Sequence, residues 1–316
     1  MNLFKRINSI KNNELIRYIW IAAVAFVATA SVFFIYYYQD RYVRPEDMSP
    51  LDISIEHLEE AVRQNPDDPA ARVALAEYYL GKELYSRSLE QTDQVLAASP
   101  DYADALLIAG IAYTRLDRSQ EAIAAHEKFV ALRKDSPMAM TDLALQAAYY
   151  FLGENYNKIG QAQQASVALE SALTINSTDA DALYQAGLSA QSLNDHEKAL
   201  GYFNQAVRFV PDFAEAYAGM NESYSALNQP DYAAYASGMQ SFSLQDYTTA
   251  QVQLQSVTRS LPEFPLAFYG LALTYEQQEN LAEALVAIKT AARLAPDDFS
   301  IKQAEGRIEA ALKAQG

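Results

Sequence analysis

The amino-acid sequence predicts an all-α fold, in which one transmembrane helix precedes an α-solenoid of helix–turn–helix repeats. An uncharged stretch near the N-terminus is long enough to cross a bilayer, and several residue types recur every 34 positions through the rest of the chain. The charge also indicates two unlike parts. Residues 1–44 carry six basic and two acidic side chains, whereas the chain as a whole has a net charge of −16.

The predicted transmembrane helix covers residues 18–38. No charged residue lies between Tyr18 and Gln39, and aromatic side chains stand at both ends of the stretch, where the two membrane interfaces favour them. The segment before the span is basic, with Lys5, Arg6, Lys11 and Arg17. By the positive-inside rule, we expect residues 1–17 in the cytoplasm and the following domain on the extracytoplasmic side.

The sequence argues against two other interpretations of this stretch. A cleaved signal peptide would end at the small residues 28–30, but the apolar run VFFIYYY follows at once, where polar residues are usual. A buried core helix is the second alternative; the aromatic and basic flanks, and a span that is apolar on all faces, argue against it. We therefore interpret residues 18–38 as an uncleaved, single-pass anchor. Residues 39–50 form a polar linker that reaches at most about 40 Å, so the domain after it should lie close to the bilayer.

Four columns of residues recur with the 34-residue spacing. A proline separates the units, a small residue and a tyrosine hold fixed places in the first helix, and an alanine holds one in the second helix. The prolines are Pro66, Pro100, Pro211, Pro262 and Pro296; the small residues are Ala76, Gly110, Gly153, Gly187, Gly238 and Ala272; the tyrosines are Tyr79, Tyr113, Tyr156, Tyr224 and Tyr275; the alanines are Ala122, Ala165, Ala199, Ala233, Ala250 and Ala284. A single helix pair cannot bury its apolar face, so stacked copies must form the core.

These columns resemble the tetratricopeptide repeat family. The resemblance covers residues 51–298 and implies an α-solenoid of paired antiparallel helices. The implied units are 69–102, 103–136, 146–179, 180–213, 231–264 and 265–298, with an atypical unit from residue 214. Residues 52–64 resemble the second helix of an opening half-repeat, and residues 299–316 a terminal capping helix with a polar outer face.

The spacing is interrupted first between Ala122 and Ala165, which are 43 residues apart, nine more than one repeat. We expect a first helix lengthened at its N-terminal end by about 13 Å, with Met138, Met140 and Leu143 on the overhang. The overhang could serve as a docking ridge, and a local packing adjustment is the alternative.

The second interruption lies between Pro211 and Pro262, which are 51 residues apart, one and a half repeats. Because residues 231–243 fit both the second-helix columns of one unit and the first-helix columns of the next, we expect this helix to serve both units. We also expect a break near residues 229–245 that divides the solenoid into lobes 50–228 and 231–316.

In this family the first helices line a concave surface that binds peptides, and the resemblance implies a groove rich in tyrosine here. The candidate partner-binding residues are Val73, Glu77, Leu107, Ile111, Arg115, Tyr150, Glu154, Asn157, Tyr184, Leu188, Gln191, Glu222, Tyr235, Met239, Phe242, Tyr269 and Leu273. Tyrosine provides contact area at small entropic cost. Since the glutamates would repel a terminal carboxylate, we expect an apolar or basic-amphipathic segment as the partner. The alternatives are a groove filled by the protein's own helices, and self-association.

The sequence contains no recognisable catalytic, cofactor or metal site. It has no cysteine, and His57, His126 and His196 lie far apart without the spacing of metal ligands. It also has no glycine-rich phosphate loop and no hydrolase motif. The strong negative charge argues against nucleic acid as a partner.

We therefore expect a non-catalytic, membrane-anchored interaction scaffold that assembles or tethers an envelope complex on the extracytoplasmic side. The alternative is an accessory subunit or maturation factor of a membrane enzyme, for example in cytochrome maturation. Both contexts rest on the resemblance to anchored tetratricopeptide repeat proteins.

Overall fold

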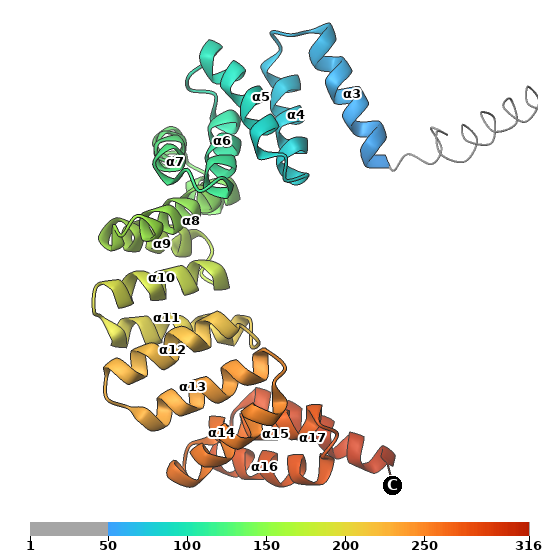
Figure 1. The fold of residues 1–316 in the computed structure, drawn as a ribbon, viewed down its shortest axis with the longest axis vertical. Helices are drawn as coiled ribbons and strands as arrows, with labels where there is room; N and C mark the ends of the chain where they lie inside the picture. The colour runs from blue at the N-terminus through green and yellow to red at the C-terminus, as the bar shows by residue number, and fades with distance from the viewer. Residues whose placement is uncertain (1–49, 316) are drawn as a thin grey trace, which may run out of the picture. The chain divides into compact units, whose positions relative to one another are not determined.

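The computed structural model describes residues 50–315, and all regular secondary structure within that range is helical (Figure 1). The elements are α3 (Pro50–Gln64), α4 (Pro69–Gly81), α5 (Tyr85–Ala98), α6 (Ala103–Arg115), α7 (Ser119–Arg133), η2 (Ala139–Thr141), α8 (Leu143–Lys158), α9 (Ala162–Ile175), α10 (Ala180–Ser192), α11 (His196–Phe209), α12 (Ala214–Ala226), α13 (Pro230–Ser243), α14 (Tyr247–Ser260), α15 (Pro265–Gln277), α16 (Leu281–Leu294) and α17 (Phe299–Gln315). The predicted all-α solenoid of helix–turn–helix repeats is confirmed for this part of the chain.

The predicted anchor at 18–38 and the N-terminal segment 1–17 lie outside the described residues, as does the linker up to residue 49. Across residues 50–315, no helix combines the length and the apolar character needed to cross a bilayer. Membrane anchoring therefore stays a prediction from the sequence.

The chain divides into two compact units, one ending at Leu75 and the other beginning at Ala76. In the first unit, the Asp68 carboxylate accepts a hydrogen bond from the Ala70 amide at 2.9 Å at the start of α4. The second unit contains α5 to α17, and each of these helices packs against the next one along the chain. The groove described below belongs wholly to the second unit.

The small-residue column allows the two helices of each pair to approach closely. A Cβ atom added at Gly110 would lie 2.5 Å from Cε1 of His126, which is 16 residues further along on the second helix. The same spacing joins Gly153 to Leu169 and Gly187 to Phe203. The residue at the second of these positions is fully buried in all three pairs. Glycine at the first position therefore makes room for a large side chain at the second.

A residue with positive φ closes the turn inside each helix pair of the described chain, as at Asp117 (φ 55°) and Asn194 (φ 60°). This left-handed conformation is uncommon for residues other than glycine and tolerated best by Asn and Asp. Helix α13 has such a turn at both ends, at Asn228 (φ 55°) and Gln245 (φ 63°). Both of its connections therefore have the geometry of a turn within a pair.

Helix α13 also packs against both α12 and α14. On the α12 side, the amide of Asn221 donates hydrogen bonds to the Ala233 carbonyl at 2.8 Å and to Ser237 Oγ at 2.9 Å. On the α14 side, a Cβ at Gly238 would lie 2.8 Å from Leu254. One helix thus presents a second-helix face to α12 and a first-helix face to α14, in agreement with its double fit to the sequence columns.

The core continues through α13. A single hydrophobic cluster extends from Leu183 on α10 to Ile308 on α17 and includes Tyr235 and Met239. The contacts described here do not test the predicted division into lobes 50–228 and 231–316, which stays a prediction.

The predicted N-terminal extension of the third unit's first helix is wrong in its extent. Helix α8 begins at Leu143, only three residues before the unit boundary at 146, and a 3₁₀ turn at Ala139–Thr141 takes up much of the insertion. An ion pair explains why. Nε and a terminal nitrogen of Arg133 donate to Oδ2 of Asp142 at 2.9 and 2.7 Å, and Oδ1 of Asp142 caps α8 by accepting from the Ala144 and Leu145 amides. Because Asp142 is fixed as the N-cap, helix α8 begins at Leu143 and does not extend further towards the N-terminus.

The terminal helix α17 covers the end of α16. Ile301, Ala304 and Ile308 are buried, while the guanidinium of Arg307 forms two hydrogen bonds, both of 2.7 Å, with the carboxylate of Glu276 on α15. Glu276 is therefore occupied in holding the terminal helix.

Candidate partner-binding groove

The first helices α8, α10 and α12 place six of the predicted residues along one hollowed surface. Glu154, Asn157, Leu188, Gln191 and Glu222 line a hollow of 480 Å³. A second hollow of 290 Å³ shares Leu188 and Glu222 with it and adds Tyr184. Tyr150 is half-buried on α8 and lines neither hollow. We call the surface formed by the two hollows the first-helix groove.

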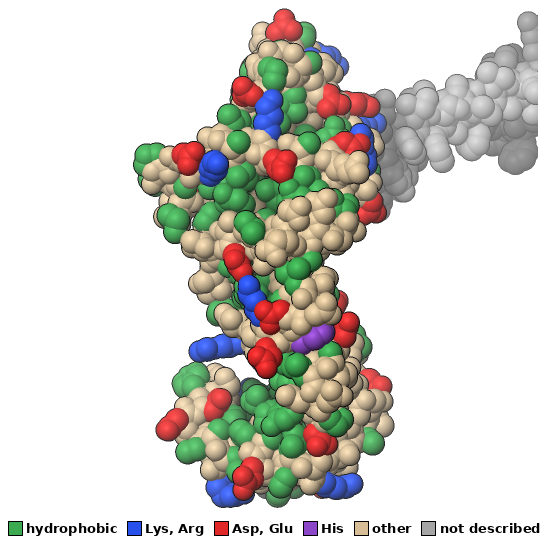
Figure 2. Space-filling view, turned by 90° about the vertical axis from the view of Figure 1, so that its left-hand side faces the viewer, with side chains coloured by type: hydrophobic (Ala, Val, Ile, Leu, Met, Phe, Trp, Pro, Cys, Tyr) green, Lys and Arg blue, Asp and Glu red, His purple; other side chains and the backbone are tan. Residues whose placement is uncertain are grey.

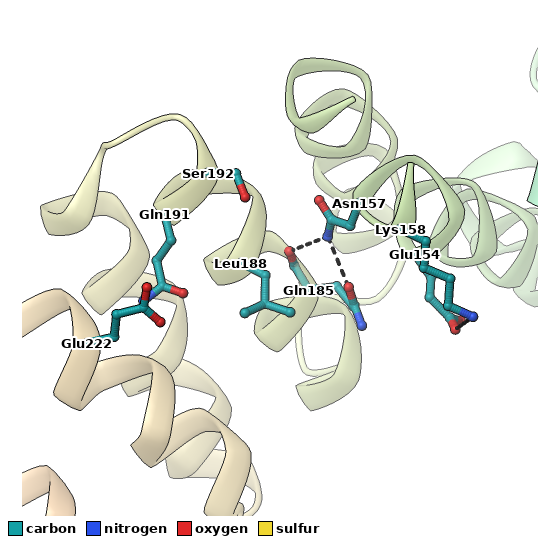
Figure 3. A pocket seen from close by; sticks show the side chains of 8 residues that line it. All are labelled: Glu154, Asn157, Lys158, Gln185, Leu188, Gln191, Ser192 and Glu222. Atoms are coloured by element: carbon teal, nitrogen blue, oxygen red, sulfur yellow. Dashed lines mark hydrogen bonds and ion pairs between the residues drawn. The ribbon is translucent and has the colours of Figure 1, made fainter. Parts of the chain in front are cut away.

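Figure 3 shows Leu188 in the middle of the larger hollow, with Glu222 on one side and Glu154 with Lys158 on the other. An apolar side chain is thus flanked by polar and charged groups from neighbouring repeats. This arrangement can hold an apolar side chain of a peptide while the rims select its polar neighbours.

Two of the predicted residues form hydrogen bonds between repeats. The Asn157 amide donates to the Gln185 carbonyl and to Gln185 Oε1, both at 3.0 Å, and accepts from Ser189 Oγ at 2.8 Å. The Gln191 amide donates to the Gly219 carbonyl at 2.8 Å and to Ser223 Oγ at 2.9 Å. These hydrogen bonds hold the shape of the groove. They also leave the two amides fewer free donors and acceptors for a partner.

The groove is electrostatically negative. Burial, together with the nearby carboxylates of Asp179, Glu154 and Glu215, raises the pKa of Asp181 above its ordinary value. The hydroxyl of Tyr150 likewise has a raised pKa, because of burial first and then the charges of Glu154 and Asp181. Carboxylates from α8, α10 and α12 therefore lie close enough to influence one another across the groove.

The cation in the larger hollow is already paired. Lys158 Nζ lies 3.0 Å from a carboxylate oxygen of Glu154 and 3.6 Å from one of Asp117. Arg115, a predicted groove residue on α6, is exposed, and its guanidinium lies 5.7 Å from the Phe151 ring centroid. The described residues of this groove therefore present no cluster of unpaired basic side chains that could bind the terminal carboxylate of a peptide.

The smaller hollow is more apolar and explains why the groove continues past α12. Tyr184 packs against Phe213 with ring centroids 5.1 Å apart, and Gln240 of α13 and Leu244, the residue after α13, complete the lining. Because α13 takes a first-helix place after α12, its C-terminal end reaches the groove.

Three predicted residues are not available to a partner. Tyr235 is 5% exposed and packs edge-on against Phe264, with ring centroids 4.9 Å apart, and its burial raises the pKa of its hydroxyl. Met239 is 4% exposed and lies against Gly270 of α15. Both are core residues because Phe264 and Gly270 pack on them. Val73, in the unit that ends at Leu75, is also buried.

The structure does not place the remaining predicted residues in either hollow. Glu77 is exposed, and the others are half-buried on their own helices: Leu107, Ile111, Phe242, Tyr269 and Leu273. Phe242 packs against Tyr247, with ring centroids 5.6 Å apart. Sequence reasoning missed Gln185, Ser192, Glu215 and Gln240, which do line the groove. Gln185 and Ser192 lie one residue beyond Tyr184 and Gln191, so a wider column would have included them.

Comparison with protein families agrees with this architecture. Tetratricopeptide repeat models match residues 51–91, 73–137, 146–179, 181–212 and 235–299. The chain belongs to the tetratricopeptide repeat family. The longest intervals between the matches are 138–145 and 213–234, which are the insertion and the atypical unit.

Two curated relatives come from Komagataeibacter xylinus. Cellulose synthase operon protein C is 29% identical over 220 residues, which is 63% of this chain and 16% of that protein. Cellulose synthase 1 operon protein C is 28% identical over 258 residues, which is 75% of this chain and 18% of that protein. The tetratricopeptide repeat chain thus spans less than a fifth of the length of these relatives.

Two solved structures have a similar fold. The MamA protein is 26% identical with a TM-score of 0.50, over 57% of this chain and 93% of that one. YrrB, described as a TPR protein with an unusual peptide-binding site, is 22% identical with a TM-score of 0.51, over 61% of this chain and 95% of that one. At 22% identity, the comparison with YrrB supports the fold alone.

Proposed function

We propose that this tetratricopeptide repeat protein is a non-catalytic, membrane-anchored scaffold that holds a partner on the extracytoplasmic side of the membrane and so assembles or tethers an envelope complex. The ligand in the first-helix groove is a basic-amphipathic segment of the partner. Family membership supports protein or peptide binding in general. The location and the chemistry of the ligand go beyond that membership.

The observation that carries the ligand chemistry is the arrangement around Leu188. Glu215 and Glu222 lie on α12, and Asp181 on α10 has its pKa raised partly by Glu215. A peptide with an apolar side chain over Leu188 and lysine or arginine on either side would bury apolar surface and neutralise these carboxylates. The hydrogen bonds of Asn157 to Gln185, and of Gln191 to Gly219, hold neighbouring repeats in place for this contact.

The test is photo-crosslinking of the full chain in its native membranes, from a photoreactive residue at position 184. Glu215→Lys combined with Glu222→Lys should lower adduct formation at least about tenfold, because two attractive charges become repulsive. Both side chains are exposed, so folding should be unaffected. Unchanged adduct yield would contradict a basic partner segment.

A matched control keeps the net charge change equal. Glu90→Lys with Glu197→Lys alters two exposed acids on second helices, outside the groove. An equal loss in this control would mean that overall charge, rather than the groove, governs capture. The identity of the adduct from position 184 would name the partner.

Orientation needs its own measurement. A reporter that is active only in the cytoplasm, fused after the C-terminus, should be inactive, because four basic residues precede the predicted span 18–38. An active reporter would place the repeats in the cytoplasm and would overturn the extracytoplasmic part of the proposal.

The second candidate function is an accessory subunit or maturation factor of a membrane enzyme, for example in cytochrome maturation. The similarity to proteins named for a cellulose synthase operon favours a place beside a synthase. Mild solubilisation and pull-down of the full chain separates these possibilities. Recovery of an enzyme in a stable, stoichiometric complex with the chain would support the accessory role. Bound haem would indicate cytochrome maturation. If neither is recovered, the result favours the scaffold function.

A further inference from the structure

Among the described residues that line the larger hollow of the first-helix groove, Lys158 is the one basic side chain. Its ammonium lies 3.0 Å from Oε1 of Glu154, on the same helix, and 3.6 Å from Oδ1 of Asp117, in the turn between α6 and α7. Figure 3 shows the Glu154–Lys158 pair on one side of Leu188. A positive charge of the chain itself thus stands where a basic partner would place its own.

Glu154 differs from the carboxylates of ordinary surface ion pairs. On the face shown in Figure 2, several basic side chains lie next to acidic ones at the open surface. The Glu154 side chain, in contrast, is only 12% exposed. Its Oε2 atom is buried and has no hydrogen-bond partner within residues 50–315. Because a buried acceptor without a donor is unfavourable, this carboxylate has reason to accept a hydrogen bond from a second cation.

Lys158 is the more movable member of the pair. It is the last residue of α8, and its side chain is 39% exposed. Its second partner, Asp117, is 88% exposed. Ion pairs in contact with solvent contribute little to stability, so the Lys158 ammonium can leave Glu154 for Asp117 with little loss of free energy.

The opposite end of the groove carries unpaired acids. Glu215 and Glu222 are exposed on α12, and neither forms an ion pair with a basic side chain in the described part of the chain. A basic segment therefore meets free carboxylates at the α12 end, and a carboxylate already neutralised by Lys158 at the α8 end. The two ends differ in whether an ion pair must be broken before the ligand can bind.

We propose that Lys158 is an internal competitor of the partner, whose ammonium occupies the place at Glu154 that a lysine or arginine of the bound segment takes. This inference rests on the proposed function, since it concerns the same groove and the same basic ligand. The incoming cation displaces Lys158, which keeps Asp117 as its partner. Segments with too little positive charge fail to displace it, so Lys158 raises the specificity of the groove for strongly basic segments.

Removal of Lys158 should therefore strengthen binding, whereas removal of an ordinary contact residue weakens it. The probe is a short, fluorescein-labelled helical peptide with blocked ends and a leucine face flanked by lysines. The full-length chain in mild detergent is titrated against it. Lys158→Gln should lower the Kd about three- to tenfold at low ionic strength, because the released Glu154 carboxylate attracts the peptide. The gain should shrink as salt is added, and Lys158→Arg, which keeps the competing cation, should bind as the unsubstituted chain does.

The matched control removes the same charge from another lysine–glutamate pair. Lys198 Nζ lies 2.8 Å from Oε1 of Glu170, its side chain is 45% exposed, and both residues are on second helices. Lys198→Gln should change the Kd less than about twofold. A second comparison places Lys158→Gln in a Glu154→Gln background. There it should also have an effect of about twofold or less, since the carboxylate for which Lys158 competes is gone.

Three results would overturn the proposal. An unchanged or higher Kd for Lys158→Gln would show that Lys158 does not compete. An equal gain in Lys198→Gln would make the overall charge the cause. An equal gain with a peptide whose lysines are replaced by glutamine would mean only that space was opened. Glutamine is a good helix former, and circular dichroism of each variant checks that the helices are retained.

Glu215→Lys combined with Glu222→Lys separates this inference from the proposed function. If that double variant does not weaken binding of the lysine peptide, the groove does not select a basic segment, and both proposals fail. If it weakens binding while Lys158→Gln has no effect, the proposed function stands and only the role of Lys158 is wrong.

Discussion

Tyr184 and Tyr235 occupy the same place in the repeat, five residues into the first helix of their units, yet they differ in what surrounds them. Tyr184 is half-buried in the first-helix groove, against Phe213. Tyr235 is 5% exposed and packs against Phe264. The column position alone therefore does not decide whether a side chain faces a partner or the core.

Tyr235 lies on the helix shared by two units, in the half-repeat between Pro211 and Pro262. Helix α13 has a second-helix contact with α12, a first-helix contact with α14 and a further contact with α15. Helix α10 packs against α8, α9, α11 and α12, yet Tyr184 on it stays half-buried. The number of neighbouring helices therefore does not explain the difference; Tyr235 is a core residue because the Phe264 ring, just before α15, packs on it.

The largest expected effect separates the two tyrosines by stability. Tyr235→Ala should lower the free energy of unfolding by about 3–5 kcal/mol, as for a large aromatic side chain removed from a core. Tyr184→Ala should lower the free energy of unfolding by clearly less, because part of the Tyr184 side chain is already exposed to solvent. Denaturant unfolding of both variants measures the difference, and equal losses would show that the two sites are packed alike.

The second prediction extends the comparison to His126 and Leu169, which occupy equivalent positions facing Gly110 and Gly153. Burial lowers the pKa of His126 to about 4, partly offset by the Gly110 carbonyl. The folded state therefore favours the neutral ring. The contribution of neutral His126 to the free energy of unfolding is fully present above about pH 6.5 and is lost as the pH falls towards 4. This loss of stability amounts to about 3 kcal/mol.

Unfolding at pH 7 and at pH 4.5 measures this contribution. His126→Leu, which copies the side chain at 169, should reduce the loss of stability between the two pH values. Because all other titrating groups are common to both proteins, the difference between them isolates His126. An unchanged pH dependence would mean that His126 becomes protonated in the folded state without cost.

The smallest effect concerns the glycine column. Gly187→Ala should destabilise by about 1–3 kcal/mol, since the added methyl would overlap the Phe203 ring. Gly201→Ala is the control, because nothing lies within 4 Å of a Cβ added there. Alanine at 201 should stabilise its helix by up to about 1 kcal/mol. Thermal unfolding distinguishes the two, and a neutral Gly187→Ala would show that the pair can open locally.

The repeats were predictable from the sequence because the packing between paired helices is local. The pairing of Gly110 with His126 depends on residues 16 apart, and a 34-residue period in such residues leaves few other folds. The two interruptions were also visible in the spacing. The shared role of α13 agrees with its sequence columns, whereas the length of α8 was predicted wrongly, because the Arg133–Asp142 pair is not apparent from spacing.

The candidate groove was predictable only in part. Tyr184 and Leu188, from two of the predicted columns, line the same hollow. The Asn157 and Gln191 amides form hydrogen bonds between repeats. Which polar side chains bond to a neighbour depends on distances across repeats, and these distances are not encoded in any single column.

The sequence by itself determined the helical repeat, the places where its period breaks, the overall negative charge and the expectation of an anchor at 18–38. Only the tertiary structure decided which members of the tyrosine column are accessible, which carboxylates meet across the groove, and where within the insertion helix α8 begins. The reason is physical. Periodicity records which residues face a neighbouring helix, whereas exposure and charge interaction depend on which side chains of other repeats reach each position and how closely they approach.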